Sequence, residues 1–264
     1  MICRHAQPKR GLLAVAWIAF VVTAHCLAAQ VAGLEIKMKT EGDLWFGEAG
    51  TFSEPLTYRM IAEHASLEWR NQLDVIDTDQ RKFYAVDLLA RTYREFGLPV
   101  DLMAALPDPR FRPATGRILD RYDPPITVQR SQVTELIAGY EVTRVDVRIG
   151  GPNEAVQGTF HMWVSADLEQ RLAAYPYRQL ERSRFASTPF AARWLTRILD
   201  SQGGVPVQVD ADFQIDGRRT KYRRTLVSIR ETELGNTDFA LPEGLERVEA
   251  LTFAKPQPLP SNGG

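Results

Sequence analysis

The chain has few of the residues that form cross-links. Of its 264 residues only two are cysteines, Cys3 and Cys26, and both fall within residues 1–29. If that segment is removed, disulfides, thiolate metal sites and cysteine nucleophiles are excluded. The core alone must then hold the protein together, which this length allows because roughly 70–75% of the surface of such a chain can be buried.

Residues suited to catalysis are equally scarce. Beyond residue 29 only His64 and His161 remain as histidines, and neither has another histidine at metal-ligand spacing. Each falls in an expected strand, which favours a hydrogen-bonded structural role. The sequence contains no Gly-x-Ser-x-Gly, phosphate-loop or His-Glu-x-x-His motif. Asp77 and Asp79 lack the later glycine and glutamate of a calcium loop and predict a turn. We therefore expect no enzymatic activity, no catalytic residue, no metal and no cofactor.

The N-terminal 29 residues have the three parts of an export signal. The basic residues at its start are Arg4, Lys9 and Arg10. An uncharged, mostly apolar run follows from Gly11 to Ala24, and small residues come at Ala28 and Ala29. This order predicts a signal peptide over residues 1–29, cleaved after Ala28 or Ala29, and hence a periplasmic protein.

Two alternatives to cleavage stay open. The run Gly11–Ala29 is 19 residues long, just enough for a retained inner-membrane anchor. The other alternative is lipidation at Cys26, although Thr23 and His25 stand where a lipobox has leucine and then glycine or alanine. The segment holds three of the 32 basic residues and none of the 33 acidic ones, so the remaining chain has 29 basic and 33 acidic side chains, a net charge of −4. That balance argues against a nucleic-acid partner.

Alternating apolar and polar residues dominate the rest of the chain and predict antiparallel strands. The clearest expected strands are those around Leu34–Met38, Leu56–Met60, Leu73–Ile76, Lys82–Asp87, Thr92–Phe96, Thr134–Ala138, Tyr140–Ile149 and Thr159–Val164. The apolar phase changes between Val142 and Val145, which predicts a bulge near Thr143-Arg144. Six prolines between residues 97 and 126 indicate a long irregular connection there, with one helical turn at Leu102–Leu106.

One helix and one hairpin are well marked near the C-terminus. Thr188 and Pro189 suit a helix start, and Gly203-Gly204 suits its end. Residues 167–185 are expected to be partly helical. Alternation over Val207–Ile215, followed by Asp216-Gly217, predicts a type I′ hairpin with a return strand over 218–229. We expect a single domain over residues 30–253 and a disordered tail over 254–264.

The return strand carries a run of positive charge that resembles an anion site. A two-residue turn places Asp212 opposite Lys221 and Asp210 opposite Arg223, so we interpret the run as cross-strand ion pairs on a solvated face. Arg218, Arg219 and Arg224 are left unmatched in this interpretation, and an anion site is the alternative.

Aromatic residues and methionines on the strands have two possible roles. They are Tyr58, Met60, Trp69, Phe83, Tyr93, Phe160, Met162 and Trp163. One role is ordinary core packing, and the other is to line the cavity of an incompletely closed barrel that holds a hydrophobic ligand. We carry Tyr58, Met60, Trp69, Phe83, Tyr93, Phe160 and Trp163 as candidate ligand-binding residues.

Several short stretches resemble a family of exported bacterial domains of unknown function. They are Asp77–Asp87 (DTDQRKFYAVD), Ala90–Phe96 (ARTYREF), Ile137–Val142 (IAGYEV), Met162–Asp167 (MWVSAD), Gly204–Val207 (GVPV) and Ala240–Gly244 (ALPEG). That family is similar in turn to the periplasmic lipoprotein carriers of the LolA/LolB type. The Pro-rich segment at 97–126 has no counterpart in those carriers.

The resemblance implies a mainly β (α+β) fold, with a strongly curved antiparallel sheet or unclosed β-barrel capped by helices. It supplies no catalytic residue. Our leading hypothesis is a periplasmic binding or carrier protein for a lipid-like or lipoprotein acyl ligand, in which helix 188–200 and segment 97–126 act as a lid. The alternative is a non-catalytic envelope interaction or sensor module with a protein partner. Cavity volume and polarity under the helices would separate the two.

Overall fold

The computed structural model describes residues 30–43, 51–101, 116–117, 120–152, 154–187 and 189–249. The expected export signal, the helical turn at Leu102–Leu106, Thr188 and the C-terminal tail fall outside these ranges. So do Trp45 and Phe46, an aromatic pair that the sequence predicts to fold back onto the core. The single-domain boundaries therefore stay a prediction. None of the helices in the described part is long and apolar enough to cross a membrane.

Twelve strands of the described chain form one sheet. They are β1 (Val31–Asp43), β2 (Thr51–Met60), β3 (His64–Trp69), β4 (Gln72–Asp77), β5 (Lys82–Asp87), β6 (Thr92–Gly97), β7 (Ile126–Ile137), β8 (Tyr140–Ile149), β9 (Val156–Ser165), β10 (Val205–Ile215), β11 (Arg218–Leu234) and β12 (Glu246–Arg247). The order is β12-β6-β5-β4-β3-β2-β1-β11-β10-β9-β8-β7. Neighbours are antiparallel except β12 and β6. The expected unclosed, curved antiparallel sheet is confirmed, with β7 and β12 as its two edges.

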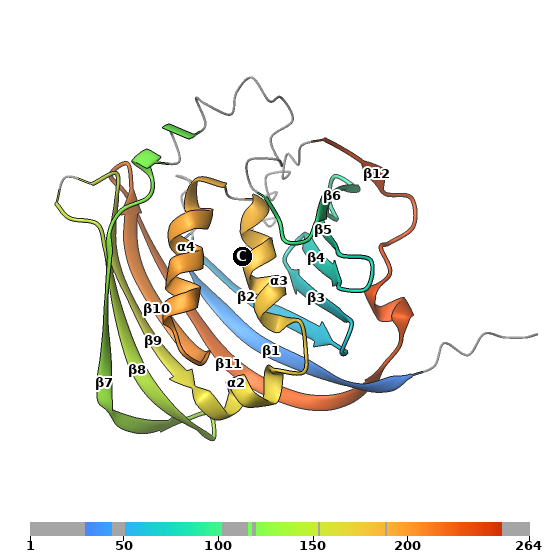
Figure 1. Ribbon diagram of the computed structural model, residues 1–264, viewed down its shortest axis with the longest axis horizontal. Helices are drawn as coiled ribbons and strands as arrows, with labels where there is room; N and C mark the ends of the chain where they lie inside the picture. The colour runs from blue at the N-terminus through green and yellow to red at the C-terminus, as the bar shows by residue number, and fades with distance from the viewer. Residues whose placement is uncertain are drawn as a thin grey trace, which may run out of the picture.

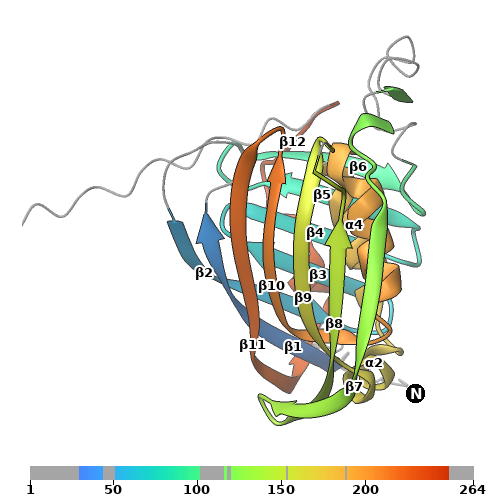
Figure 2. The same cartoon turned by 90° about the vertical axis from the view of Figure 1, so that its left-hand side faces the viewer.

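Two runs of sequential strands meet at the centre of the sheet. The first run extends from β1 to β6, and the second extends from β7 to β11. Figure 2 shows the outer surface of the second run. β11 then returns to pair with β1 from Val31↔Leu234 to Gly42↔Tyr222. This long pairing joins segments that are far apart in the sequence into a single curved layer.

Short helices lie inside the curve of the sheet (Figure 1). They are α2 (Ala166–Leu172), α3 (Tyr177–Ser183) and α4 (Pro189–Ser201), with the 3-10 turn η3 (Arg184–Ser187). A second 3-10 turn, η4 (Asn236–Phe239), follows β11 and packs on the outer face. Ser165 caps α2 by accepting a hydrogen bond from the amide of Leu168. The expectation of partial helix over 167–185 and of a helix near 188–200 is confirmed.

The core lies mainly between the inner, concave face of the sheet and these helices. One apolar group surrounds α3 and includes Tyr58, Phe83 and Leu180. A second surrounds α4, where Trp194 packs edge-on against Phe160 and Phe213. A smaller third group, with Val75, Leu234 and Phe239, covers the outer face near η4.

The edge strand β7 differs from the expectation in two ways. It begins at Ile126, eight residues before the expected start at Thr134. Its register against β8 shifts between Arg130 and Thr134, whereas β8 pairs with β9 without a shift. The pairs Arg130↔Val145 and Thr134↔Thr143 place this irregularity at the predicted position near Thr143-Arg144, but the extra residues belong to β7 and not to β8. The extra residues sit in the edge strand, where only one neighbour constrains the register.

Candidate functional site: a polar cluster under helix α3

A buried arginine on the inner face of β11 is the centre of the candidate site. Arg224 shares the inward phase of Leu226 and is 6% exposed. Its neighbour Arg223 points to the outer face and forms an ion pair with Asp210 at 2.6 Å. The expected register of the hairpin is confirmed, and the turn is of type I′ because Asp216 and Gly217 both have positive φ.

Arg219 and Arg224, both expected to be unmatched, have partners. Arg219 forms a bidentate pair with Asp212, the partner expected for Lys221. Arg224 does not lie on the solvated face, since the period of two along the strand turns it toward α3. The interpretation of the whole run as surface charge is therefore wrong for Arg224.

Tyr58 of β2 and Glu181 of α3 meet Arg224 inside the core. The Tyr58 hydroxyl donates to Glu181 Oε1 at 2.6 Å. Arg224 Nη1 lies 3.2 Å from the Tyr58 hydroxyl and 3.4 Å from Glu181 Oε2. Arg184, just after α3, donates to Glu181 Oε1 at 3.1 Å. We call Tyr58, Asp74, Tyr177, Glu181, Arg184 and Arg224 the inner polar cluster.

The two carboxyl groups of the cluster have opposite pKa shifts. Burial would raise the pKa of Glu181, but Arg224, Arg184 and the Tyr58 hydrogen bond outweigh it and lower the pKa to about 2. Burial raises the pKa of Asp74 on β4 to about 7, and the charge of Arg184 only partly opposes this. Glu181 is thus a permanent carboxylate, whereas Asp74 titrates near neutral pH.

Two polar atoms of the cluster have no hydrogen-bond partner among the described residues. They are Nε of Arg224 and the hydroxyl of Tyr177. Tyr177 is 2% exposed, and its ring centre lies 5.5 Å from that of Tyr58. Buried donors are almost always paired, so these two atoms of one cluster are donors that lack an acceptor in the described part of the protein.

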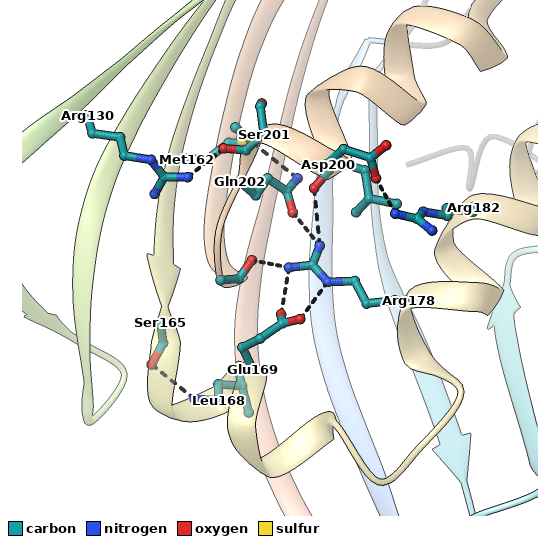
Figure 3. A network of polar contacts seen from close by, with 12 residues as sticks. Arg130, Met162, Ser165, Leu168, Glu169, Arg178, Arg182, Asp200, Ser201 and Gln202 are labelled. Carbon is teal, nitrogen blue, oxygen red and sulfur yellow. Dashed lines mark hydrogen bonds and ion pairs between the residues drawn. The ribbon is translucent and has the colours of Figure 1, made fainter.

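A separate arginine clamp holds α3 over this part of the sheet (Figure 3). Arg178 donates to both carboxylate oxygens of Glu169 in α2, at 3.0 and 2.6 Å. It also reaches the Gln202 side chain at 3.2 Å and the Gly204 carbonyl at 2.7 Å, both beyond α4. The clamp ties three helical segments together and so fixes where Glu181 enters the core.

The residues expected to bind a ligand lie on both faces of the sheet. Tyr58, Met60 and Phe83 are fully buried in the inner group around α3, and the half-buried Trp69 packs against it. Phe160 and Met162 belong to the group around α4. Tyr93 lies instead on the outer face beside Tyr84, with ring centres 6.2 Å apart.

The remaining candidate, Trp163, is half-buried. Along β9 it alternates in phase with Phe160, and it packs against the inner group around α3. The guanidinium carbon of Arg144 lies 5.5 Å from its ring centre. Trp163 thus has both an apolar and a cationic neighbour.

Both histidines lie in strands. His161 of β9 contacts Asp146 on the outer face. His64 of β3 stacks on Phe239 and borders an outer cleft of about 440 Å³. Asp77 accepts a hydrogen bond from the amide of Gln80 in the expected turn. In the part of the chain that the structure describes, no group of His, Cys, Asp and Glu side chains is arranged to hold a metal ion.

Sequence reasoning missed Glu181, Arg184 and Tyr177 and misplaced Arg224. A signal for Arg224 does exist, because Leu226 and Arg224 share one phase of the strand. The helical residues gave no comparable signal, since a Glu and an Arg three residues apart are ordinary on an exposed helix.

No family model matches this chain, and neither does any curated protein. Among solved structures, PNGF-II in the P21 space group aligns with a TM-score of 0.40 and 10% identity over 83% of this chain. Its C2 form gives 0.40 and 11% over 85%. The chain spans only 31% and 32% of those structures.

A third solved structure is the LolA superfamily protein NE2245 from Nitrosomonas europaea. It has a TM-score of 0.28 and 8% identity over 79% of this chain and 90% of that one. These are distant likenesses, and none is close enough to carry an argument about function.

Proposed function

We propose that this protein is an exported, non-enzymatic carrier that binds a lipid-like or acyl ligand between the inner face of its sheet and helices α3 and α4. One observation carries the proposal. The inner face of an open sheet is apolar along both strand runs, and short helices cover it instead of a second sheet. Such a cover can move without breaking any strand pairing.

Two of the contacts at the exposed side of the cover are weak. Arg182 of α3 pairs with Asp200 of α4, and Arg197 of α4 pairs with Asp123; all four side chains are partly exposed. Exposed ion pairs contribute roughly 0–1 kcal/mol each. An acyl chain that enters beneath the helices gains roughly 0.8 kcal/mol for each buried CH₂.

Glu181 is suited to holding a charge and not to proton transfer. Glu181 is held by Tyr58 and two arginines, with its pKa lowered to about 2 by these neighbours against the effect of burial. A carboxylate that stays ionised at neutral pH is a poor proton donor or acceptor for catalysis. The periplasmic location rests on the predicted export signal.

The alternative is an envelope interaction module. One observation favours it: on edge strand β7, Val133 is 65% exposed and Leu136 is 76% exposed. An open strand edge with apolar side chains is a template for pairing with another protein. Co-purification of one protein partner, lost on substitution of these two residues, would favour this function over the carrier.

Two measurements test the carrier proposal. The exported chain, purified without detergent, is extracted and its lipids are identified by mass spectrometry. The delipidated chain is then titrated with a fluorescent fatty acid. We expect bound acyl lipid in the extract and saturable uptake. Protein free of lipid that also takes up no probe would contradict the proposal.

A matched pair of variants locates the binding. Met60→Trp fills the inner face, whereas Val227→Trp adds the same bulk at an exposed position of β11. We expect Met60→Trp to lower uptake and Val227→Trp to leave it unchanged, with circular dichroism as the check on folding.

A further inference from the structure

We propose that the inner polar cluster recognises the anionic head, a carboxylate or a phosphate monoester, of an amphiphilic ligand. The inference rests on the proposed carrier function, because the chain of the same molecule would occupy the apolar interior. It adds the property by which the protein would select among amphiphiles, namely an anionic head group whose oxygens contact Arg224 and Tyr177.

The cluster contains two buried hydrogen-bond donors that lack an acceptor within the described ranges of the chain. Arg224 Nε can only donate, and it has no partner among the described residues although Arg224 is 94% buried. The Tyr177 hydroxyl, on the first residue of α3, is also unpartnered and buried. An oxyanion offers several lone pairs and satisfies both donors at once.

The two donors belong to one connected site. Arg224 Nη1 lies 3.2 Å from the Tyr58 hydroxyl, and the Tyr58 ring packs against that of Tyr177. The donors therefore flank the same tyrosine, one from β11 and one from α3. A head group bound there would bridge the sheet and the helix that covers it.

The charge of the cluster also suits an anion. Arg184 and Arg224 face one permanent carboxylate, Glu181. The second carboxyl, Asp74, is partly protonated near neutral pH because burial raises its pKa to about 7. The cluster then carries excess positive charge, which an anionic head group would neutralise in a low-dielectric interior.

Apolar side chains continue directly from the cluster. Leu56 and Met60 flank Tyr58 on the same face of β2, and Leu180 precedes Glu181 on α3; all three are buried in the inner group around α3. A ligand held by its head at Arg224 therefore has apolar surface within reach of its chain. This arrangement fits a single-chain amphiphile better than a free small anion.

The test compares three dodecyl compounds that differ only in the head group. The full chain is titrated at about pH 6.5, where Asp74 is mostly protonated, with dodecanoic acid, dodecyl phosphate and dodecanol, each below the concentration at which it aggregates or separates from solution. We expect at least one of the two anions to bind about tenfold more tightly than the alcohol, since a charge-assisted hydrogen bond is worth about that much. The tighter of the two anions identifies the head group.

Matched variants assign the preference to the cluster. Tyr177→Phe removes an unpartnered hydroxyl, so we expect unchanged unfolding but about fivefold loss of the preference for the anion over dodecanol. Arg224→Met should abolish the preference. Arg223→Met, one residue away on the outer face, should leave it unchanged. Tyr177→Phe keeps the test decisive if Arg224→Met does not fold.

The outcomes separate the two proposals. Equal affinity for all three compounds, or a preference that Tyr177→Phe leaves intact, overturns the head-group site while the carrier function stands. If no dodecyl compound binds, both proposals are overturned.

Discussion

At the scale of single residues, the sharpest contrast is between Arg223 and Arg224. They are adjacent on β11, yet Arg223 pairs with Asp210 on the outer face while Arg224 lies in the core beside Tyr58 and Glu181. Removing the one carboxylate that holds a buried arginine typically costs about 3–5 kcal/mol, whereas an exposed pair contributes less than about 1 kcal/mol. The same residue type therefore has two different energetic roles in one strand.

Asp74 should make the stability of the protein depend on pH. Burial raises the pKa of Asp74 from 3.8 to about 7 in the folded state. Between these pH values Asp74 is ionised in the unfolded chain but protonated in the folded protein. The contribution of Asp74 to stability therefore falls as pH rises from about 4 to about 7. We expect Asp74→Asn to gain about 3 kcal/mol relative to the native chain over this range, measured by urea unfolding at several pH values.

Glu181 provides the internal contrast for that measurement. Its pKa is lowered to about 2, because its arginine neighbours outweigh the effect of burial. Its stabilising effect is therefore present above about pH 4.5 and lost only as pH falls toward 2. A difference between Asp74→Asn and the native chain that stays constant from pH 4 to pH 7 would show that Asp74 does not titrate in this window.

At the scale of elements, the position of helix α3 is stabilised by the hydrogen bonds of Arg178 more than by the helix's own backbone hydrogen bonds. The helix α3 has only seven residues, and isolated helices this short are unstable in water. Arg178 secures it through Glu169, Gln202 and the Gly204 carbonyl (Figure 3). The amphipathic α4 is held instead by Trp194 and Ile198 in the apolar interior.

We expect Arg178→Met to lower the free energy of unfolding by about 1–2 kcal/mol, because it removes several charge-assisted hydrogen bonds of a partly exposed side chain. Hydrogen exchange should speed up in α2 and α3 and much less in β1 and β11. Arg182→Met is the matched control, since Arg182 is on the same helix but forms only an exposed pair with Asp200. Equal losses in the two variants would rule out the clamp.

Several elements were predictable from local patterns. Alternation predicted β5 with its observed bounds of Lys82 and Asp87, and Asp216-Gly217 predicted the β10–β11 turn, where both residues take positive φ. The start of β7 was missed because its residues are mostly exposed and show no clean alternation. A strand with little burial has little pattern for a sequence to reveal.

At the scale of the whole molecule, the open sheet leaves one long edge exposed. β7 pairs with β8 on one side, and no described strand pairs with its other side. Val133 and Leu136 are exposed there. The curvature of the sheet shields its inner face but not this edge.

We expect the double substitution Val133→Lys and Leu136→Lys to change stability by less than about 0.5 kcal/mol, because neither side chain is buried. Sedimentation velocity should show less self-association than in the native chain, since charges on an edge strand oppose pairing. The double substitution Lys37→Gln and Lys39→Gln on the central strand β1 is the control. A large loss of stability in the edge variant would mean that the edge is covered in solution.

The sequence by itself determined the local strands, the type I′ turn and the helical segments. These follow from short-range periodicity and turn chemistry, which each segment carries within itself. The curved, unclosed sheet was implied by the family resemblance and not by any local pattern. Only the tertiary structure decided which polar residues meet in the core. Tyr58 and Glu181 are 123 residues apart, and Tyr58 and Arg224 are 166 apart. Their contact depends on the β1–β11 pairing and on the position of α3, and local spacing encodes neither.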